Sequence, residues 1–258
     1  MIRALWTAAT GMEAQQISQD VVANNLANIN TVGFKKARAD FQDLMYQIYS
    51  KSGAETSGGS QLGIEIGMGV KPMAVQKMFG QGDYMQTDNP FDIAIEGDGF
   101  FQLDKNGDTV YTRAGNFKVD KDGSLCNSEG LKLIPAVDVP MEMVHFTVDS
   151  GGTWTATDGQ GNPLAIGRIE LARFTNPAGL TSLGRNLYDR TDASGDATVG
   201  NPGEDGNGTI SQRFLEMSNV NVVDEMVKMI VGQRAYEINS KAIQTADSML
   251  QMANGLKR

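Results

Sequence analysis

Apolar residues near the C-terminus recur at alternating intervals of four and three residues, which is the period of one face of an α-helix. A second apolar run, spaced 3-4-3, precedes it and begins near Asn221, a residue type that often caps a helix start. We therefore predict one long helix over about 221–254 with coiled-coil character. An ordinary amphipathic helix on a globular core is the alternative. The main run comprises Val231, Ala235, Ile238, Ala242, Thr245, Met249, Met252 and Leu256.

The N-terminal residues 1–29 contain no proline and a single glycine, Gly11. Their apolar positions also follow helical spacing, which predicts a helix with one narrow apolar stripe. An isolated helix of this kind is marginal in water, because packing supplies most helical stability. We therefore expect the two terminal helices to pair with each other or with other chains. The stripe is formed by Ile2, Leu5, Ala9 and Met12, and then by Val22, Leu26 and Ile29.

The middle of the chain, about 70–217, has the pattern of successive β-hairpins. Short β-type runs alternate with glycines at roughly eight-residue intervals, at positions 107, 115, 123 and 130. Between it and the first helix, 34–69 includes the small, polar run SKSGAETSGGSQLG, which breaks any helix. The sequence thus predicts an α+β fold, with an all-β domain inserted between the terminal helices. We place the boundaries at 1–33, 34–69 (an extended connecting segment), 70–217 and 218–258.

Composition narrows the range of functions. The chain has 258 residues, a net charge of −9 and a pI of about 4.7. An acidic chain is unsuited to binding nucleic acid, which requires a clustered basic surface. We expect no transmembrane helix, because no apolar run of 18 residues occurs. We also expect no cleaved signal peptide, because Glu13 and Asp20 interrupt the N-terminal apolar positions.

Residues that could carry catalysis are few. The only cysteine is Cys126 and the only histidine is His145, so a nucleophilic triad or a histidine-based metal site is not expected. The turns DKNGD and DKDGS lack the ligand spacing of a calcium loop and fit hairpin turns. Asp92, Glu96 and Asp98 could form an acid pair, but their sequence spacing does not establish it. We predict no catalytic residue, no metal and no cofactor.

Several motifs, in order along nearly the whole chain, resemble those of the bacterial flagellar rod and hook proteins. They include ALWTAATGMEAQQ, VVANNLANINTVGFKK, AIEGDGFFQL, YTRAGNFKVDKDGSL and SNVNVVDEMVKMIVGQRAYEINSKAIQTADSML. Within the family, the chain length and the segment at about 46–65 resemble the distal rod members most. Proximal rod or hook-type members of the same family are the alternative. An enzyme on a β-scaffold, such as a hydrolase of peptidoglycan, is a hypothesis from a different class.

The resemblance implies a mechanism. Subunits would stack helically into a straight, hollow drive shaft that carries torque from motor to hook and encloses the export channel. The long N- and C-terminal helices, paired as a coiled coil, would line the inner tube, and the β-domain would form the outer tube. Implied partners are other copies of the chain, proximal rod proteins, the hook protein, the peptidoglycan and outer-membrane rings, and the flagellar type III export apparatus. The implied location is the basal body, from periplasm to outer membrane, without membrane insertion.

The resemblance also implies two sets of functional residues. The segment at 46–65 would bridge neighbouring subunits and keep the tube straight through Tyr46, Tyr49, Leu62 and Glu65. The amides of NNLANIN would belong to an assembly surface, and Gly33 suits the turn that leaves the helix. The residues expected to pack between subunits are Leu5, Met12, Asn24, Asn25, Leu26, Asn28, Gly33, Val231, Ala235, Ile238, Ala242, Met249, Met252 and Leu256.

Overall fold

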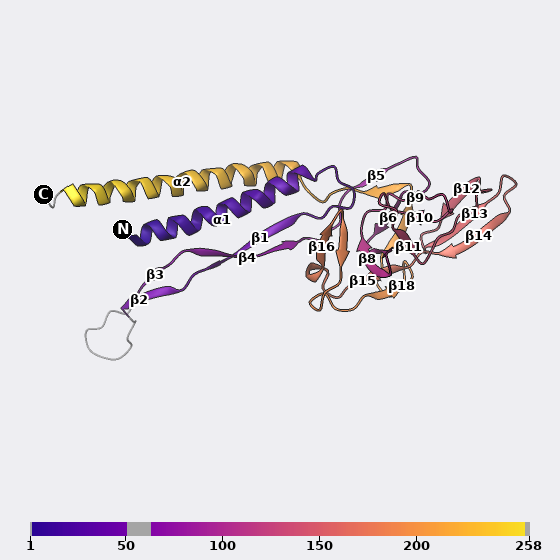
Figure 1. Ribbon diagram of the computed structural model, residues 1–258, viewed down its shortest axis with the longest axis horizontal. Coiled ribbons are helices and arrows are strands. Elements are labelled where there is room, and N and C mark those ends of the chain that lie inside the picture. Colours follow the sequence, from indigo (N-terminus) through magenta and orange to yellow (C-terminus); the bar gives the residue numbers. More distant parts are fainter. Residues whose placement is uncertain (1, 51–62, 256–258) are drawn as a thin grey trace. The chain divides into compact units, whose positions relative to one another are not determined.

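The computed structural model describes residues 2–50 and 63–255 (Figure 1). These residues form an α+β fold in which an N-terminal helix and a C-terminal helix flank a large β-domain, as the sequence predicts. The chain divides into two compact units. The first comprises Met1–Ala27, Ala37–Gln76 and Asn221–Arg258, and the second comprises Asn28–Lys36 and Lys77–Val220.

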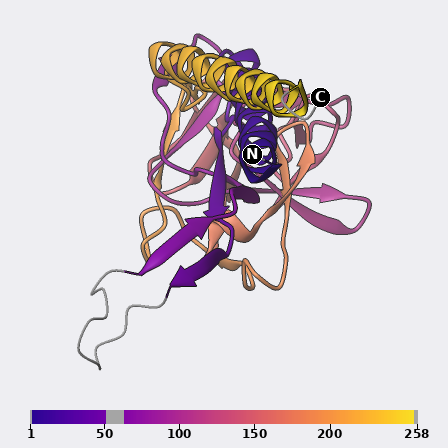
Figure 2. The same cartoon turned by 90° about the vertical axis from the view of Figure 1, so that its left-hand side faces the viewer.

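In the first unit, helices α1 (Ile2–Ala27) and α2 (Val222–Gly255) lie side by side and run antiparallel (Figures 1 and 2). Helix α2 begins directly after a capping residue, Asn221. The Asn221 side-chain oxygen accepts hydrogen bonds from the backbone N–H groups of Val223, at 3.0 Å, and Asp224, at 3.4 Å. Asp224 and Glu225 also place negative charge in the first turn, where the helix dipole favours it. The long C-terminal helix and its predicted cap are confirmed.

The first unit also contains a β-arm, which we define as the strands β1 (Ala37–Asp43), β2 (Tyr46–Ser50), β3 (Ile64–Gly67) and β4 (Val70–Lys77). Strand β1 pairs with β4, and β2 pairs antiparallel with β3. The apolar positions of 34–48 also suit a helix face, yet most of these residues form the strands β1 and β2. The β-branched and aromatic side chains of β2 and β3 favour extended backbone, and pairing satisfies their peptide groups.

The second unit is built from short antiparallel strands. Its largest sheet has seven strands, in the order β16-β17-β8-β7-β11-β10-β9. A separate meander orders β12-β13-β14, and the pairs β15-β18, β19-β6 and β20-β5 complete the unit. The strands are β5 (Tyr84–Gln86), β6 (Ile93–Glu96), β7 (Phe101–Lys105), β8 (Asp108–Thr112), β9 (Lys118–Val119), β10 (Leu125–Cys126), β11 (Lys132–Ile134), β12 (His145–Val148), β13 (Thr153–Thr157), β14 (Pro163–Arg168), β15 (Leu171–Arg173), β16 (Thr181–Gly184), β17 (Leu187–Asp189), β18 (Thr198–Gly200), β19 (Thr209–Gln212) and β20 (Phe214–Glu216), with a 3-10 turn at Pro177–Gly179.

One hairpin illustrates how sequence sets this topology. Asn106 and Gly107 join β7 to β8 as a two-residue turn, with φ of 57° and 96°. Positive φ at both residues is the type I′ geometry that Asn-Gly favours, and its twist matches that of the paired strands. Successive side chains of a strand point to opposite faces of the sheet, so Phe101 and Leu103 enter one core, whereas Gln102 is buried on the other face. The core of this unit also contains Ile93, Ile95, Phe117, Leu125, Leu133, Trp154, Ile169 and Leu171.

Candidate assembly site

The face of α2 that packs against α1 includes a row of small and polar residues. On α2 these are Glu225, Gly232, Asn239 and Ala246, which are spaced seven residues apart as in a heptad repeat. A Cβ on Gly232 would lie 3.4 Å from the Gln19 side chain, so the helices approach closely there. Met229, Ile243 and Leu250, which follow Glu225, Asn239 and Ala246 by four residues, are half-buried, so the contact combines small, polar and apolar side chains.

The predicted apolar stripe of α2 lies outside this contact. Its large members, Val231, Ile238, Met249 and Met252, are 42–66% exposed in the single chain. Ala242 is also exposed, and Ala235 is half-buried. A helix rarely displays so much contiguous apolar surface unless a partner covers it. On α1, Leu5, Met12 and Leu26 are half-buried, and Leu256 lies outside the described residues.

The asparagines at the end of α1 differ in how far they are buried. Asn25 is buried, and its side-chain N–H donates to the Ala37 carbonyl, at 2.9 Å, and to Glu225, at 3.1 Å. Its oxygen accepts the Ala37 N–H at 2.9 Å. Asn25 thus joins the end of α1 to the starts of β1 and α2 within one chain. Asn24 is exposed and Asn28 half-buried, and the intersubunit contacts expected of the cluster stay predictions.

The β-arm displays an apolar surface of its own. Tyr46, Tyr49 and Glu65 are exposed, while Leu62 lies outside the described residues. Arg3 donates a hydrogen bond to the Tyr49 hydroxyl, and its guanidinium carbon lies 5.1 Å from the centre of the Tyr49 ring. This contact fastens part of the arm to α1. The remaining exposed apolar side chains of the arm are Phe41, Met45, Ile48, Ile64, Ile66, Met68, Met73 and Val75.

A buried ion cluster, formed by Lys35, Arg113 and Glu216, holds the second unit together next to its chain connections. Glu216 accepts from the Lys35 ammonium and from the Arg113 Nε, each at 2.6 Å. It also accepts the Gly82 N–H at 2.9 Å, and Lys35 donates to the Gly80 carbonyl at 2.8 Å. The cluster therefore ties together three segments that are far apart in the sequence. Sequence reasoning missed it because Lys35 and Glu216 are 181 residues apart.

The second cation of the cluster also organises a turn. Arg113 donates to the carbonyl oxygens of Ile95, Gly97 and Gly99 in addition to Glu216. These carbonyls belong to the stretch AIEGDGFF, in which Gly97 and Gly99 have φ of 103° and 145°. The glycines allow the chain to curl around the guanidinium. The carbonyl groups of this stretch therefore help to hold the buried guanidinium in place.

Replacing Glu216 with Gln tests the cluster. We expect a loss of about 3–5 kcal/mol of unfolding free energy, because two buried cations would lose their carboxylate. Burial raises the pKa of the Glu216 carboxyl, but the charges of Arg113 and Lys35 outweigh it and hold the pKa below its ordinary value of 4.5. The carboxylate's stabilisation is therefore complete above that pH and is lost as the pH falls through the folded-state pKa.

Urea unfolding between pH 3 and pH 7 measures this effect, with the exposed Glu142→Gln as the matched control. The wild type and the control should lose stability on acidification, and E216Q should show a smaller acid-dependent loss from a lower starting value. If the unfolding free energy of E216Q changed with pH as much as that of the wild type, the charge of Glu216 would not contribute to stability.

Gly33 lies beside this cluster, in a conformation that only glycine adopts readily. Its φ is +67°, its N–H donates to the Glu216 carbonyl at 2.8 Å, and an added Cβ would lie 2.6 Å from the Ala114 nitrogen. The structure therefore places Gly33 in a tight turn packed against the β-domain. Its expected contact with another subunit stays a prediction.

Gly33→Ala should destabilise the second unit more than Gly130→Ala. Both glycines have positive φ, so each substitution carries a backbone cost of about 1–2 kcal/mol. A Cβ at Gly130 meets nothing within 4 Å, whereas at Gly33 it meets backbone atoms. Thermal unfolding of the two variants separates steric overlap from backbone strain. Equal losses would show that the close approach at Gly33 is easily relaxed.

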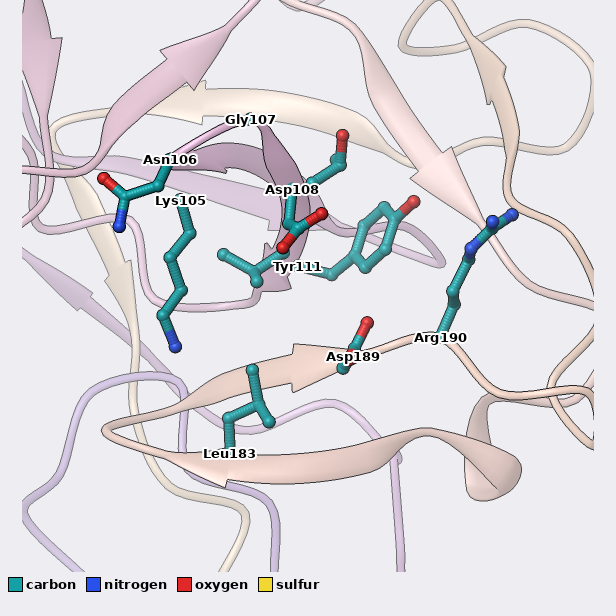
Figure 3. A pocket seen from close by; sticks show the side chains of 10 residues that line it. Lys105, Asn106, Gly107, Asp108, Tyr111, Leu183, Asp189 and Arg190 are labelled. Carbon is teal, nitrogen blue, oxygen red and sulfur yellow. The ribbon is translucent and has the colours of Figure 1, made fainter.

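The second unit contains an open groove of about 780 Å³ (Figure 3). It lies between the β7–β8 hairpin and strands β16 and β17, with Asp108 on one side and Asp189 on the other. Burial raises the pKa of Tyr111 in its wall, so this phenol stays protonated at neutral pH. Two carboxylates in an open groove do not by themselves form an acid–base pair. Among the described residues, no cluster of ligand side chains could hold a metal.

The described helices also answer the question of membrane insertion. Neither α1 nor α2 combines the length and the apolar composition that a bilayer crossing requires.

Three family models match the chain, at its start, in its middle and at its end. The model described as "Flagella basal body rod protein" matches residues 5–35. "Flagellar hook protein FlgE/F/G D1 domain" matches residues 94–156, and "Flagellar basal body rod FlgEFG protein C-terminal" matches residues 211–256. The first and third matches lie mainly on α1 and α2, and the second lies on the β-domain.

Full-length relatives also carry flagellar rod names. A protein named flagellar basal-body rod protein FlgG from Borreliella burgdorferi is 48% identical, over 100% of both chains. Proteins of that name from Caulobacter vibrioides and Bacillus subtilis are 43% and 38% identical. The alignment covers 99% of this chain and 100% of the relative in the first case, and 100% of both in the second.

Proposed function

This chain belongs to the family of flagellar basal-body rod proteins and is a structural subunit of the distal rod, and from that membership we propose how it assembles. The exposed apolar stripe of α2 packs against helices of neighbouring copies and forms the inner wall of a hollow tube. The single observation that carries this proposal is the stripe itself, since the contact between α1 and α2 leaves it uncovered.

The proposed contact is a coiled coil between subunits. The stripe repeats at four and three residues, the spacing that keeps apolar side chains on one seam. Burying each large apolar side chain contributes roughly 1.5–3 kcal/mol, so four such residues provide a substantial driving force. The alanines at 235 and 242 allow the helices to approach closely. We also assign Leu5, Met12, Leu26 and Leu256 to the packing between subunits, with Asn24 and Asn28 setting its register.

The β-arm makes the second proposed contact. Its exposed tyrosines and aliphatic residues lie on a neighbouring subunit, bridge the two and keep the tube straight. Tyr46, Tyr49, Leu62 and Glu65 are the residues that we assign to this bridge. A paired β-arm resists bending more than a flexible loop, because its backbone groups are held by cross-strand hydrogen bonds.

The remaining proposals concern location and partners. We infer that the β-domain forms the outer wall of the tube and faces the rings of the peptidoglycan layer and outer membrane. The rod then extends from periplasm to outer membrane, between proximal rod proteins and the hook protein, after delivery by the flagellar type III apparatus without a cleaved signal. Cosedimentation of purified rings with assembled tubes tests the ring contact, and retention of both in the supernatant would count against it.

A further inference from the structure

The second unit contains a smaller hollow, of about 160 Å³, beside the ion cluster. We call it the cation pocket. Lys35 and Arg113 line it together with three aromatic side chains, Phe79, Phe100 and Phe174. Both cations are at least nine-tenths buried. At its exposed rim lie Asp98, Arg173 and Thr175.

The cluster beside the pocket has an excess of positive charge. Lys35 and Arg113 share one carboxylate, Glu216, so the three side chains carry a net charge of +1 away from water. At the rim, the negative charge of Asp98 and the positive charge of Arg173 sum to zero, so they do not neutralise the excess charge of the cluster. Buried charge without a counter-charge is costly. Burial lowers the pKa of Lys35 and outweighs the opposing effect of Glu216, as expected for an ammonium with too little negative charge around it.

Both cations also retain hydrogen-bonding capacity. An ammonium has three N–H groups, and Lys35 uses two of them, on Glu216 and on the Gly80 carbonyl. A guanidinium has five, and Arg113 uses four, on Glu216 and on three backbone carbonyls. One donor on each cation is thus without a partner among the described residues. An anion in the pocket would satisfy the charge and the donors together.

The size and lining of the pocket select the anion. A volume of about 160 Å³ holds one side chain or a small organic acid. The rings of Phe79, Phe100 and Phe174 suit an apolar stem, while the two cations suit a carboxylate, which accepts hydrogen bonds through both oxygens. A dianion such as phosphate is disfavoured because Glu216 is already bound to both cations.

We propose that the cation pocket is a carboxylate-binding site, and that an Asp or Glu side chain of a neighbouring copy occupies it in the assembled rod. The second part rests on the proposed self-assembly, which places copies side by side. The chain itself is a rich source of such groups, with 31 Asp and Glu residues against 22 Lys and Arg. A free organic acid is the other possible source of the same chemistry.

The first arm of the test uses the full chain as a dilute monomer and phenylacetate as the probe. Thr175→Trp obstructs the rim at an exposed position without replacing a residue of the ion cluster. Thr147→Trp, at an exposed position of β12, is its matched control. Isothermal titration should show binding to the wild type and T147W. Phenylacetate should bind T175W at least about tenfold more weakly, because the Trp side chain obstructs the rim. The neutral phenylacetamide should bind the wild type at least about tenfold more weakly, because its hydrogen bonds to the two cations lack the negative charge. Equal binding of acid and amide, or no binding of either, overturns the carboxylate site.

The second arm identifies the source of the carboxylate by light scattering during assembly. If a neighbouring copy supplies it, T175W slows assembly at least about tenfold, and phenylacetate slows assembly of the wild type. If T175W assembles at the rate of T147W although the monomer binds phenylacetate, the neighbouring copy is excluded as the source. Normal assembly with no phenylacetate binding overturns the pocket and leaves the proposed rod function intact, so the two failures are distinguishable.

Discussion

Ala242→Asp should abolish assembly and leave the monomer folded. Ala242 is exposed in the single chain and lies within the apolar stripe of α2, so the carboxylate is hydrated in the monomer. On assembly the same carboxylate would enter a helix–helix seam without a cationic partner. Burying an unpaired charge there costs several kcal/mol, and this cost recurs at every subunit interface of a polymer. The critical concentration for assembly should therefore rise by more than about a hundredfold.

Gln244→Asp is the matched control for this substitution. Gln244 is exposed on α2, two residues from Ala242 and off the stripe. Both variants place a new carboxylate in the same turn of the helix, so they differ mainly in the face that carries it. Pelleting at increasing protein concentration measures assembly, and circular dichroism of the dilute protein checks the fold. If A242D pelleted at the same protein concentration as the wild type, the stripe would not be part of the interface.

Deleting residues 46–65 should yield tubes that bend, while the β-domain stays folded. The deletion removes β2 and the first part of β3, and it joins Met45 to Ile66. Strands β1 and β4 then remain connected through residues 44–45 and 66–69, a length that is common for connections between secondary-structure elements. The inner seam of α2 is untouched, so assembly continues. The proposed bridge between neighbours is lost, so the persistence length of the tube falls by at least about tenfold.

The control for this deletion keeps the length of the β-arm and changes its surface. Tyr46→Ser with Tyr49→Ser removes two exposed aromatic side chains that we assign to the bridge. This variant should give an intermediate stiffness in electron micrographs. Straight tubes from the deletion variant would contradict the assignment of stiffness to this segment, whereas loss of all tubes would show that the segment is needed for assembly itself.

Sequence periodicity predicted the helices well because it reports local backbone preference and the face that is kept apolar. The heptad-like run ending at Leu256 and the cap at Asn221 located α2 to within a residue or two at each end. The same periodicity could not tell which face joins α1. That contact includes Glu225, Gly232 and Asn239, which give no apolar signal and which interrupt the apolar positions of the face.

Long-range ion pairs were the main omission. Lys35, Arg113 and Glu216 meet only because the strands of the second unit fold them together, and each looks like an ordinary surface charge in its local sequence. For the same reason, local sequence did not show that the hydrogen bonds of Asn25 fasten three segments within one chain. Its expected place on an assembly surface stays a prediction. Local sequence predicted the type of each element, and tertiary contacts decided which polar residues are buried.

The form of the polymer tests the central claim most directly. Purified chain, concentrated until it polymerises, should appear by electron microscopy as straight hollow tubes of uniform diameter, with helical density lining the channel. Curved tubes, solid fibrils without a channel, or a protein that stays monomeric at all concentrations would contradict the account.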